Sequence, residues 1–300
     1  MKIDLSKIGT EQQNKNTMNI DQLSTIEMVR LINKEDQAVI DAVEAAIPQI
    51  ANAVDAIYET ILKGGRLVYI GAGTSGRLGV LDASEVLPTY GIGEEAVVGL
   101  IAGGDIALRH PVEAAEDDET AVIVDLEGIK FNKNDILCAI ASSGRTPYCI
   151  GGLKYARSLG AKTISLACVA DSEIGKLADF PIEAVVGQEV VTGSTRMKSG
   201  SATKMVLNIL TSGAMIKYGK VYGNLMVDVK TSNEKLVERA KGIIMKATDV
   251  DYDRASYLLE ASDNHVKTAI VMQETNRDKE AAIALLDAND GRISNAIKNQ

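Results

Sequence analysis

Apolar residues recur at helical spacing between Ala38 and Ile61, and this stretch ends at Gly64-Gly65, a typical helix stop. Further upstream, Ser24 and Glu27 have the spacing of a capping box and predict the start of a helix. After Gly65, short β-rich runs alternate with helical patterns. Strands are predicted at 67–70, 97–101, 136–140, 163–166 and 182–186, and helices from Ser75, from about Pro111, from Pro147 and over 199–217. This alternation predicts an α/β fold with a parallel sheet sandwiched by helices.

The last sixty residues contain an internal repeat with a shift of 27 positions. Ala255, Leu258 and Leu259 recur as Ala282, Leu285 and Leu286. Each copy predicts a helix, a short turn and a second helix, with the turns at Asp263-Asn264 and Asp290-Gly291. We therefore divide the chain into an α/β domain over residues 1–240 and a small helical bundle over residues 241–300.

The composition and the net charge argue against nucleic acids and membranes as binding partners. The chain has 300 residues, of which 46% are hydrophobic and 24% charged, as in ordinary globular proteins. Its formal net charge of −9 argues against nucleic-acid binding, which depends on Lys and Arg neutralising phosphates. The segment Met1–Thr10 is polar and lacks the apolar core of a signal peptide, and no apolar stretch is long enough to span a bilayer. We expect a cytoplasmic protein with no membrane partner.

The cysteines and histidines do not indicate a metal site. Cys138, Cys149 and Cys168 are odd in number and lie in or beside apolar segments, which favours reduced, buried thiols. His110 and His265 are the only histidines, and no cysteine pair has ligand spacing. We expect neither a metal nor a cofactor.

Two short loops carry the candidate chemistry. Gly71–Gly76 and Ala141–Thr146 each follow a predicted strand and precede a helical pattern, so both should lie at carboxyl ends of parallel strands, where α/β sheets bind ligands. Glycines let the backbone approach an anion, and N–H groups at a helix start favour phosphate. The candidate ligands are Thr74, Ser75, Ser142, Ser143, Gly144 and Thr146. Two such loops on one sheet predict a phosphosugar site.

The first loop also matches the dinucleotide fingerprint G-x-G-x-x-G through its three glycines. That fingerprint requires an acidic residue about 20 positions later, at the end of the second strand. Asp82 and Glu85 come too early, and Asp105 follows two further glycines. A nicotinamide cofactor would also leave the second loop unexplained. A pair of purely structural turns is the other alternative, and we favour the phosphosugar reading over both.

The first loop and the residues after it resemble the signature of N-acetylmuramic acid 6-phosphate etherases. The resemblance covers nearly the whole chain, in the order and at the spacing of that family. It includes the segments 71–85, 88–90, 101–104, 112–117, 141–148, 190–198 and 222–228. Two departures from the commonest pattern, Ala114 and Val86-Leu87, do not touch a proposed catalytic group.

The resemblance implies a sugar isomerase (SIS) domain, a C-terminal bundle of the ubiquitin-associated (UBA) type and a homodimer. It implies cleavage of the D-lactyl ether of N-acetylmuramic acid 6-phosphate to N-acetylglucosamine 6-phosphate and D-lactate, during recycling of cell-wall sugars. By motif, the catalytic positions are Glu85, as the acid, and Glu116, as the base. Glu189 and Ser194 would line the sugar site. Arg145 and Arg196 are candidates for holding a phosphate or carboxylate, with ion pairing at the surface as the alternative.

The chemistry explains why two carboxylates suffice. In the open-chain sugar, the C1 aldehyde acidifies the C2 proton, so a base can remove it and lactate can leave from C3. Two alternatives remain: a non-catalytic phosphosugar-sensing regulator, which needs neither glutamate, and a sugar-phosphate isomerase, which needs no acid at C3.

The position of Glu85 raises a geometric question. It lies ten residues after Ser75, so a continuous helix would carry it about 15 Å from its own phosphate loop. Either the helix breaks near Gly79, or Glu85 serves the site of a neighbouring subunit.

Overall fold

The computed structural model describes residues 9, 12–112, 114–231 and 233–299. The chain divides into two compact units. The first unit comprises Met1–Ser84 and Glu95–Thr211, and the second comprises Glu85–Glu94 and Ser212–Gln300. Both predicted phosphate loops fall in the first unit, and the repeat falls in the second.

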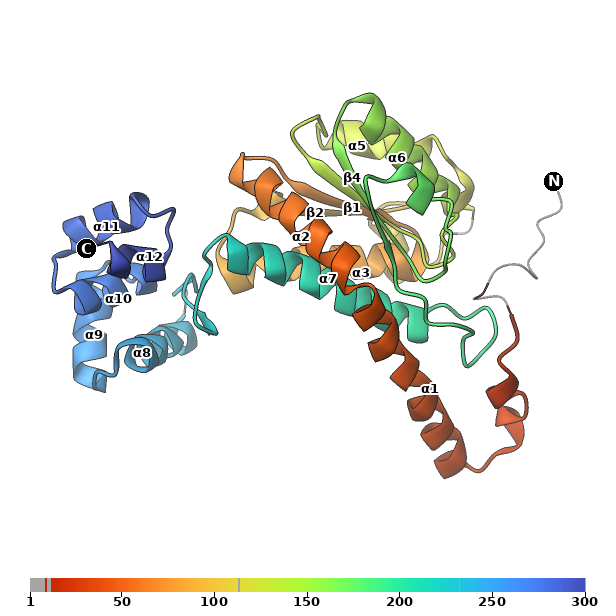
Figure 1. Cartoon of the computed structure of the whole chain (residues 1–300), viewed down its shortest axis with the longest axis horizontal. Coiled ribbons are helices and arrows are strands. Elements are labelled where there is room, and N and C mark those ends of the chain that lie inside the picture. The colour runs from red at the N-terminus through yellow and green to blue at the C-terminus, as the bar shows by residue number, and fades with distance from the viewer. Residues whose placement is uncertain (1–8, 10–11, 113, 232, 300) are drawn as a thin grey trace. The chain divides into compact units, whose positions relative to one another are not determined.

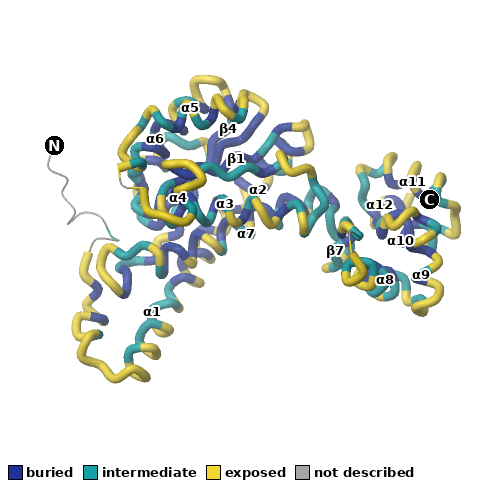
Figure 2. Tube along the Cα trace, turned by 180° about the vertical axis from the view of Figure 1, so that it is seen from behind, coloured by how far each residue is buried: buried dark blue, intermediate teal, exposed yellow. Residues whose placement is uncertain are grey.

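The first unit is built on a five-stranded parallel sheet with the strand order β2-β1-β3-β4-β5. The strands are β1 (Leu67–Gly71), β2 (Val97–Ile101), β3 (Ile136–Ile140), β4 (Lys162–Ala167) and β5 (Phe180–Glu183). Every residue of β1 and β3 is buried, and the sheet runs through the interior of the unit in Figure 2. The predicted fold class is confirmed.

Helices cover both faces of the sheet (Figure 1). One face carries α5 (Ala121–Gly128) and α6 (Pro147–Ser158); the other carries α2 (Ile47–Leu62), α3 (Gly73–Tyr90) and α7 (Lys198–Lys217). Val68 and Ile70 point into the cluster around α5 and α6. Gly79 of α3 packs closely on the opposite face, since a Cβ atom there would lie 3.1 Å from Tyr69 Cβ.

Strand β5 lies two residues earlier than the sequence pattern predicts. It pairs with β4 from Phe180 opposite Ile164, and it contains Pro181. Proline supplies no N–H, but β5 is an edge strand and has no neighbour on its outer side within the described sheet. The apolar run 182–186 therefore marks the end of the strand and the start of the loop after it.

The predicted helix from about Pro111 is wrong. The chain has a short α4 (Ile106–Arg109), then a single 3-10 turn at Ala115–Asp117, and the next α-helix is α5. Ala114 adopts a left-handed conformation with φ of 63°, which interrupts a right-handed helix. Glu116 therefore lies on a loop wall rather than on a long helix.

The predicted capping box is confirmed at the start of α1 (Thr25–Ala45), where the Ser24 N–H donates to the Glu27 carboxylate at 3.0 Å. The amphipathic stretch after it forms two helices, because α1 ends at Ala45 and α2 begins at Ile47 with Pro48 in its first turn. Further 3-10 turns occupy 15–17, 20–22, 94–96 and 175–177.

The second unit includes a hairpin and a group of helices. These are β6 (Val221–Tyr222), β7 (Leu225–Met226), α8 (Glu234–Thr248), α9 (Tyr252–Ala261), α10 (Val266–Thr275), α11 (Lys279–Asp287) and α12 (Ile293–Lys298). The predicted repeat is confirmed as two helix-turn-helix units whose turn residues all have positive φ. Asp251 and Asp278, also 27 residues apart, cap α9 and α11. The predicted boundary at residues 240/241 falls inside α8, whose Ala240 is buried in the helical core.

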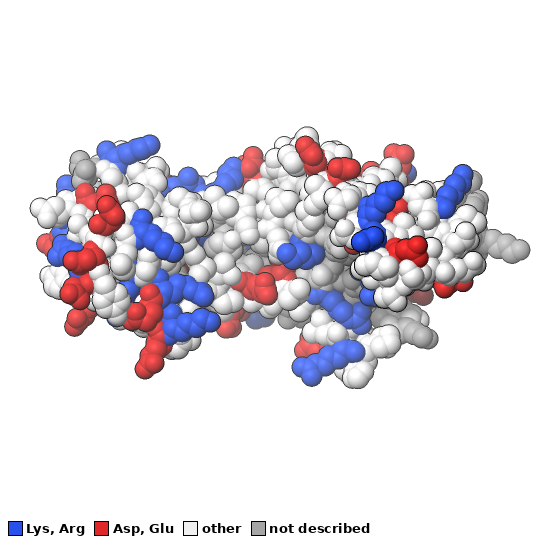
Figure 3. Space-filling model, turned by 90° about the horizontal axis from the view of Figure 1, so that it is seen from below, with Lys and Arg blue, Asp and Glu red and all other residues white. Residues whose placement is uncertain are grey.

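In the described part of the chain, none of the helices is long and apolar enough to cross a membrane. Acidic and basic side chains are interspersed on the face shown in Figure 3. This mixture offers a polyanion little to bind on that face.

The amino end of α7 is held by an internal carboxylate. Glu189 is fully buried, and its two oxygens accept the backbone N–H groups of Lys198 and Ser199 at 3.0 and 2.9 Å. The first N–H groups of a helix have no partner within the helix, so this side chain satisfies two of them in a place that water does not reach. Glu189 therefore fixes where α7 begins.

We expect Glu189→Ala to lower the free energy of unfolding by about 2–4 kcal/mol, because two buried N–H groups lose their hydrogen-bond acceptor. Urea denaturation followed by circular dichroism measures this. The matched control is Glu173→Ala, whose side chain is 56% exposed and pairs with Arg145 at the surface; it should change stability by at most about 0.5 kcal/mol. An unchanged stability in Glu189→Ala would contradict the capping role.

Candidate active site

The two predicted loops meet at the carboxyl edge of the sheet. Strands β1 and β3 are parallel neighbours, with Gly71 opposite Ile140, so the loops after them start side by side. Ser75 and Ser142 are both buried, and their hydroxyl oxygens lie 3.4 Å apart. Residues 67 positions apart in the chain thus present hydroxyl groups to one place.

The first loop turns tightly because of its glycines. Gly73 has φ of 52°, which L side chains rarely adopt. A Cβ atom at Gly76 would lie 2.6 Å from the Gly71 carbonyl oxygen, so the loop could not fold back on itself with a larger residue there. This geometry places Thr74 and Ser75 in the first turn of α3.

The second loop is fixed against the turn after β4. Gly144 has φ of 71°, and a Cβ atom there would lie 2.5 Å from Ser172 Cβ. Ser143, Gly144 and Arg145 line a cavity of about 510 Å³ together with the segment 168–173. Thr146 is half-buried and precedes the first residue of α6.

Glu116 lies beside the first loop. It lines a cavity of about 160 Å³ together with Gly73 and Arg77. Arg77 donates to the carbonyl oxygens of Ala107 and Leu108 at 2.7 and 3.0 Å, and thereby holds the α4 segment next to the loop. The carboxylate predicted as the base therefore shares a cavity with a predicted phosphate loop.

Glu85 is exposed and lies on α3, which is one uninterrupted helix from Gly73 to Tyr90. The predicted alternative of a helix break near Gly79 is wrong. That glycine serves close packing on the sheet, because a Cβ atom there would also lie 3.1 Å from Ile140 Cδ1. The rise of the helix keeps Glu85 about 15 Å from Ser75.

The two other predicted residues belong to the segment before α7. Glu189 faces backbone N–H groups in the interior, and its carboxylate is not open to solvent. Ser194 is half-buried in a turn, where its N–H donates to the Val191 carbonyl at 2.9 Å. Both residues shape the start of α7, which faces the first loop: a Cβ atom at Gly200 would lie 3.6 Å from the Thr74 methyl group.

A buried polar cluster that the sequence analysis missed joins α3 to α7. The Asp82 carboxylate accepts hydrogen bonds from Tyr69 Oη at 3.0 Å, Asn208 Nδ2 at 2.7 Å and Thr211 Oγ1 at 3.3 Å. Burial and the nearby carboxylate raise the pKa of Tyr69 well above its usual value, so the phenol stays a donor. The sequence feature that could have predicted this cluster is Asp82 itself, an acidic residue at a position where the helical pattern of α3 faces the interior.

The three cysteines are buried and free, as predicted. Burial raises the pKa of Cys168 to about 11 and that of Cys149 to about 12, so both thiols are protonated near neutral pH. A protonated thiol is a poor nucleophile, which argues against thiolate catalysis at this edge of the sheet.

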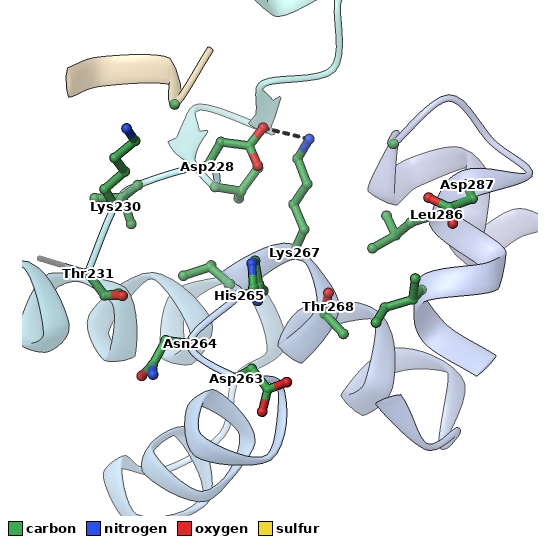
Figure 4. A pocket seen from close by; sticks show the side chains of 16 residues that line it. Asp228, Lys230, Thr231, Asp263, Asn264, His265, Lys267, Thr268, Leu286 and Asp287 are labelled. Carbon is green, nitrogen blue, oxygen red and sulfur yellow. Dashed lines mark ion pairs between the residues drawn. The ribbon is translucent and has the colours of Figure 1, made fainter. Parts of the chain in front are cut away.

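The second unit has a cavity of its own, of about 790 Å³ (Figure 4). Asp228 lies at its wall and pairs with Lys267 at 2.7 Å and with Lys220 at 3.1 Å. Burial lowers the pKa of Lys267 despite this partner. None of the residues predicted for the site lines this cavity, and its paired charges indicate a role in packing the unit.

Comparison with known proteins identifies the family. The SIS domain model matches residues 115–212, and the model for the glucokinase regulatory protein N-terminal SIS domain matches residues 49–157. The solved structure of the protein c3406 from Escherichia coli CFT073 has a TM-score of 0.50 at 18% identity and covers 67% of this chain and 97% of its own. This likeness establishes the fold alone.

Closer relatives extend over most of the chain. An N-acetylmuramic acid 6-phosphate etherase of Clostridium botulinum strain Hall is 56% identical over 268 residues, which are 89% of either chain. The protein of the same description from Actinobacillus pleuropneumoniae serotype 5b is 56% identical over 89% of this chain and 88% of its own. Because more than half of the residues are identical over nearly the whole length of both proteins, the chain belongs to the N-acetylmuramic acid 6-phosphate etherase family.

Proposed function

We propose that this protein is a carbon-oxygen lyase that cleaves the D-lactyl ether of N-acetylmuramic acid 6-phosphate, giving N-acetylglucosamine 6-phosphate and D-lactate. The observation that carries the proposal is the shared cavity of Glu116 and Gly73, which puts a carboxylate next to a phosphate loop. The buried, free thiols suit a reducing compartment, and we propose the cytoplasm as the location.

In the elimination step, the Glu116 carboxylate takes the C2 proton of the open-chain aldehyde. The electron pair forms the C2–C3 double bond as the C3–O bond breaks, and Glu85 gives its proton to the departing lactate oxygen. Water then adds at C3, giving one proton back to Glu85, while Glu116 returns a proton to C2. Each positioned proton transfer contributes about 10²–10⁴-fold to the rate.

The phosphate group positions the sugar for this chemistry. Hydroxyl donors come from two loops, and Gly144 lets the second loop pack against the turn after β4. These donors are Thr74, Ser75, Ser142, Ser143 and Thr146. Because the hydroxyl oxygens of Ser75 and Ser142 already lie 3.4 Å from each other, one phosphate could accept hydrogen bonds from both. Binding energy at the phosphate would then hold C2 near Glu116.

We also propose a homodimer in which Glu85 acts in the site of the neighbouring subunit. An unbroken α3 keeps Glu85 about 15 Å from its own Ser75, which is too far for one small sugar. Glu85 is exposed on the single chain, so a neighbouring subunit can reach it. Exposed apolar side chains on α1, such as Ile26 at 58% and Ile40 at 53%, offer a surface for a partner.

The function is tested by incubating the protein with N-acetylmuramic acid 6-phosphate and measuring D-lactate. An etherase releases stoichiometric D-lactate, whereas a phosphosugar-sensing regulator or an isomerase releases none. The same assay separates the roles of the two carboxylates when it is combined with exchange of the C2 proton of N-acetylglucosamine 6-phosphate in deuterated water.

Glu116→Gln should lose both ether cleavage and C2 exchange, because the base is gone. Glu85→Gln should lose cleavage by at least about 10²-fold but keep C2 exchange, because the base is intact. Both substitutions conserve volume on exposed side chains, so both variants should fold. The reverse pattern of exchange would swap the two roles, and normal cleavage in both variants would contradict the elimination mechanism.

Removing a loop hydroxyl should weaken substrate binding. We expect Ser75→Ala and Ser143→Ala each to raise KM by about tenfold or more with a smaller change in kcat, because a hydrogen bond to a charged phosphate is lost. Steady-state kinetics of D-lactate release measure this. Ser158→Ala is the control, since that hydroxyl donates to the Tyr155 carbonyl at the other end of α6. A normal KM in both loop variants would rule out this phosphate site.

Subunit mixing tests the shared site. At substrate concentrations well below KM, Glu85→Ala homodimers should be nearly inactive and Ser75→Ala homodimers should be slower by about tenfold or more. A mixed dimer nevertheless contains one site with neither substitution if Glu85 comes from the neighbour. Mixed dimers should therefore recover activity, up to about one intact site for each dimer. If each site instead takes Ser75 and Glu85 from the same subunit, every site of a mixed dimer contains one substitution. Mixing would then restore no activity, and the shared-site proposal would be wrong.

A further inference from the structure

A second cavity borders the first loop at Thr74, and Glu116 does not line it. We call it the cationic pocket; it has a volume of about 360 Å³ and is lined by Thr74, Leu78, Arg196, Gly200, Ser201, Lys204 and Met205. The first turn of α3 supplies one wall, and the start of α7 supplies the other. Two of the lining side chains are cations, and none of them is a carboxylate.

The walls of the cationic pocket are firmly held although its cations are exposed. Glu189 caps the amino end of α7, and the Cys168 thiol donates to the Ser199 carbonyl at 3.5 Å. Lys198, close to the pocket in sequence, is buried and pairs with Glu35 at 3.4 Å. The backbone around Arg196 and Lys204 is therefore anchored from the interior.

Within the part of the chain that the structure describes, the charges of Arg196 and Lys204 are not neutralised. Among residues 9, 12–112, 114–231 and 233–299, no carboxylate forms an ion pair with either side chain. The protein has a net charge of −9, so two such unpaired cations beside one small cavity give this place a positive charge that differs from that of the whole molecule. Such a pair favours an anion of matching size.

The first loop separates two cavities of different chemistry. Gly73 faces the one that contains Glu116, and Thr74, the next residue, faces the cationic pocket. A ligand whose phosphate is held by the loop could therefore reach both. The substrate of the proposed function has a second anionic group besides its phosphate, the carboxylate of the lactyl ether.

We infer that Arg196 and Lys204 bind the lactyl carboxylate and make the site specific for the ether over its sugar product. This inference rests on the proposed function. The guanidinium and ammonium groups would neutralise the lactyl carboxylate. Otherwise the carboxylate would lie in a site that also contains two acidic residues, Glu116 and the Glu85 of the neighbouring subunit. The product N-acetylglucosamine 6-phosphate has no carboxylate, so it gains nothing from the cationic pocket.

Two reactions of the same protein test the inference, because only one of their substrates has the carboxylate. Arg196→Met and Lys204→Met keep the apolar stem and remove the charge. Each should raise the KM for D-lactate release by about tenfold or more, the size of one lost charged contact. The KM for C2 exchange of N-acetylglucosamine 6-phosphate should stay within about twofold, and intact exchange also shows that each variant is folded.

The control for loss of one positive charge is Lys133→Met. Lys133 is exposed in the turn before β3, at the amino edge of the sheet, and both KM values should stay unchanged there. If Arg196→Met and Lys204→Met weaken both reactions equally, the cations hold the phosphate and the inference is wrong. Unchanged KM values in both reactions also overturn it. Failure of the unsubstituted protein to release D-lactate would instead reject the proposed function itself.

Discussion

The parallel pairing of β1 with β3 is the constraint on which the site depends. Parallel strands end at the same edge, so the register that puts Gly71 opposite Ile140 also brings their loops together. A shift of one residue would turn Tyr69 and its neighbours to the other face and separate Ser75 from Ser142. The fully buried strands prevent such a shift, because it would exchange the apolar contacts of both faces.

The packing of α3 against α7 depends on a different interaction. Asp82 is 5% exposed, and three uncharged side chains donate hydrogen bonds to it, those of Tyr69, Asn208 and Thr211. A buried carboxylate is costly unless its oxygens are hydrogen-bonded, so the donors and the helix must keep their places together. The cluster thereby sets the rotation of α3, the helix that begins at the first loop and continues past Glu85.

Local pattern predicted most of the fold and both loops, because short apolar runs such as β3 end at glycine- and serine-rich turns. Family resemblance, rather than pattern, selected the two glutamates that we propose as catalytic. The errors arose where tertiary context overrides local pattern. The bounds predicted for β5 were wrong because an edge strand tolerates Pro181. The helix predicted from about Pro111 was wrong because Ala114 adopts a left-handed conformation, which an alanine in the sequence does not predict. Glu189 could equally face a sugar or cap a helix until the fold places Lys198 and Ser199 beside it.

The uninterrupted α3 has a consequence for how this chain can vary. In a helix, every added or deleted residue rotates the downstream turns by about 100° and shifts them by about 1.5 Å. An insertion between Ser75 and Glu85 would therefore turn the carboxylate to another side of the helix, even if every new side chain were compatible with helical structure. Exposed positions of this stretch can accept substitutions, but the stretch cannot accept a change of length. Insertions in the turn at Gly91–Gly93, after the helix, would leave the position of Glu85 unchanged.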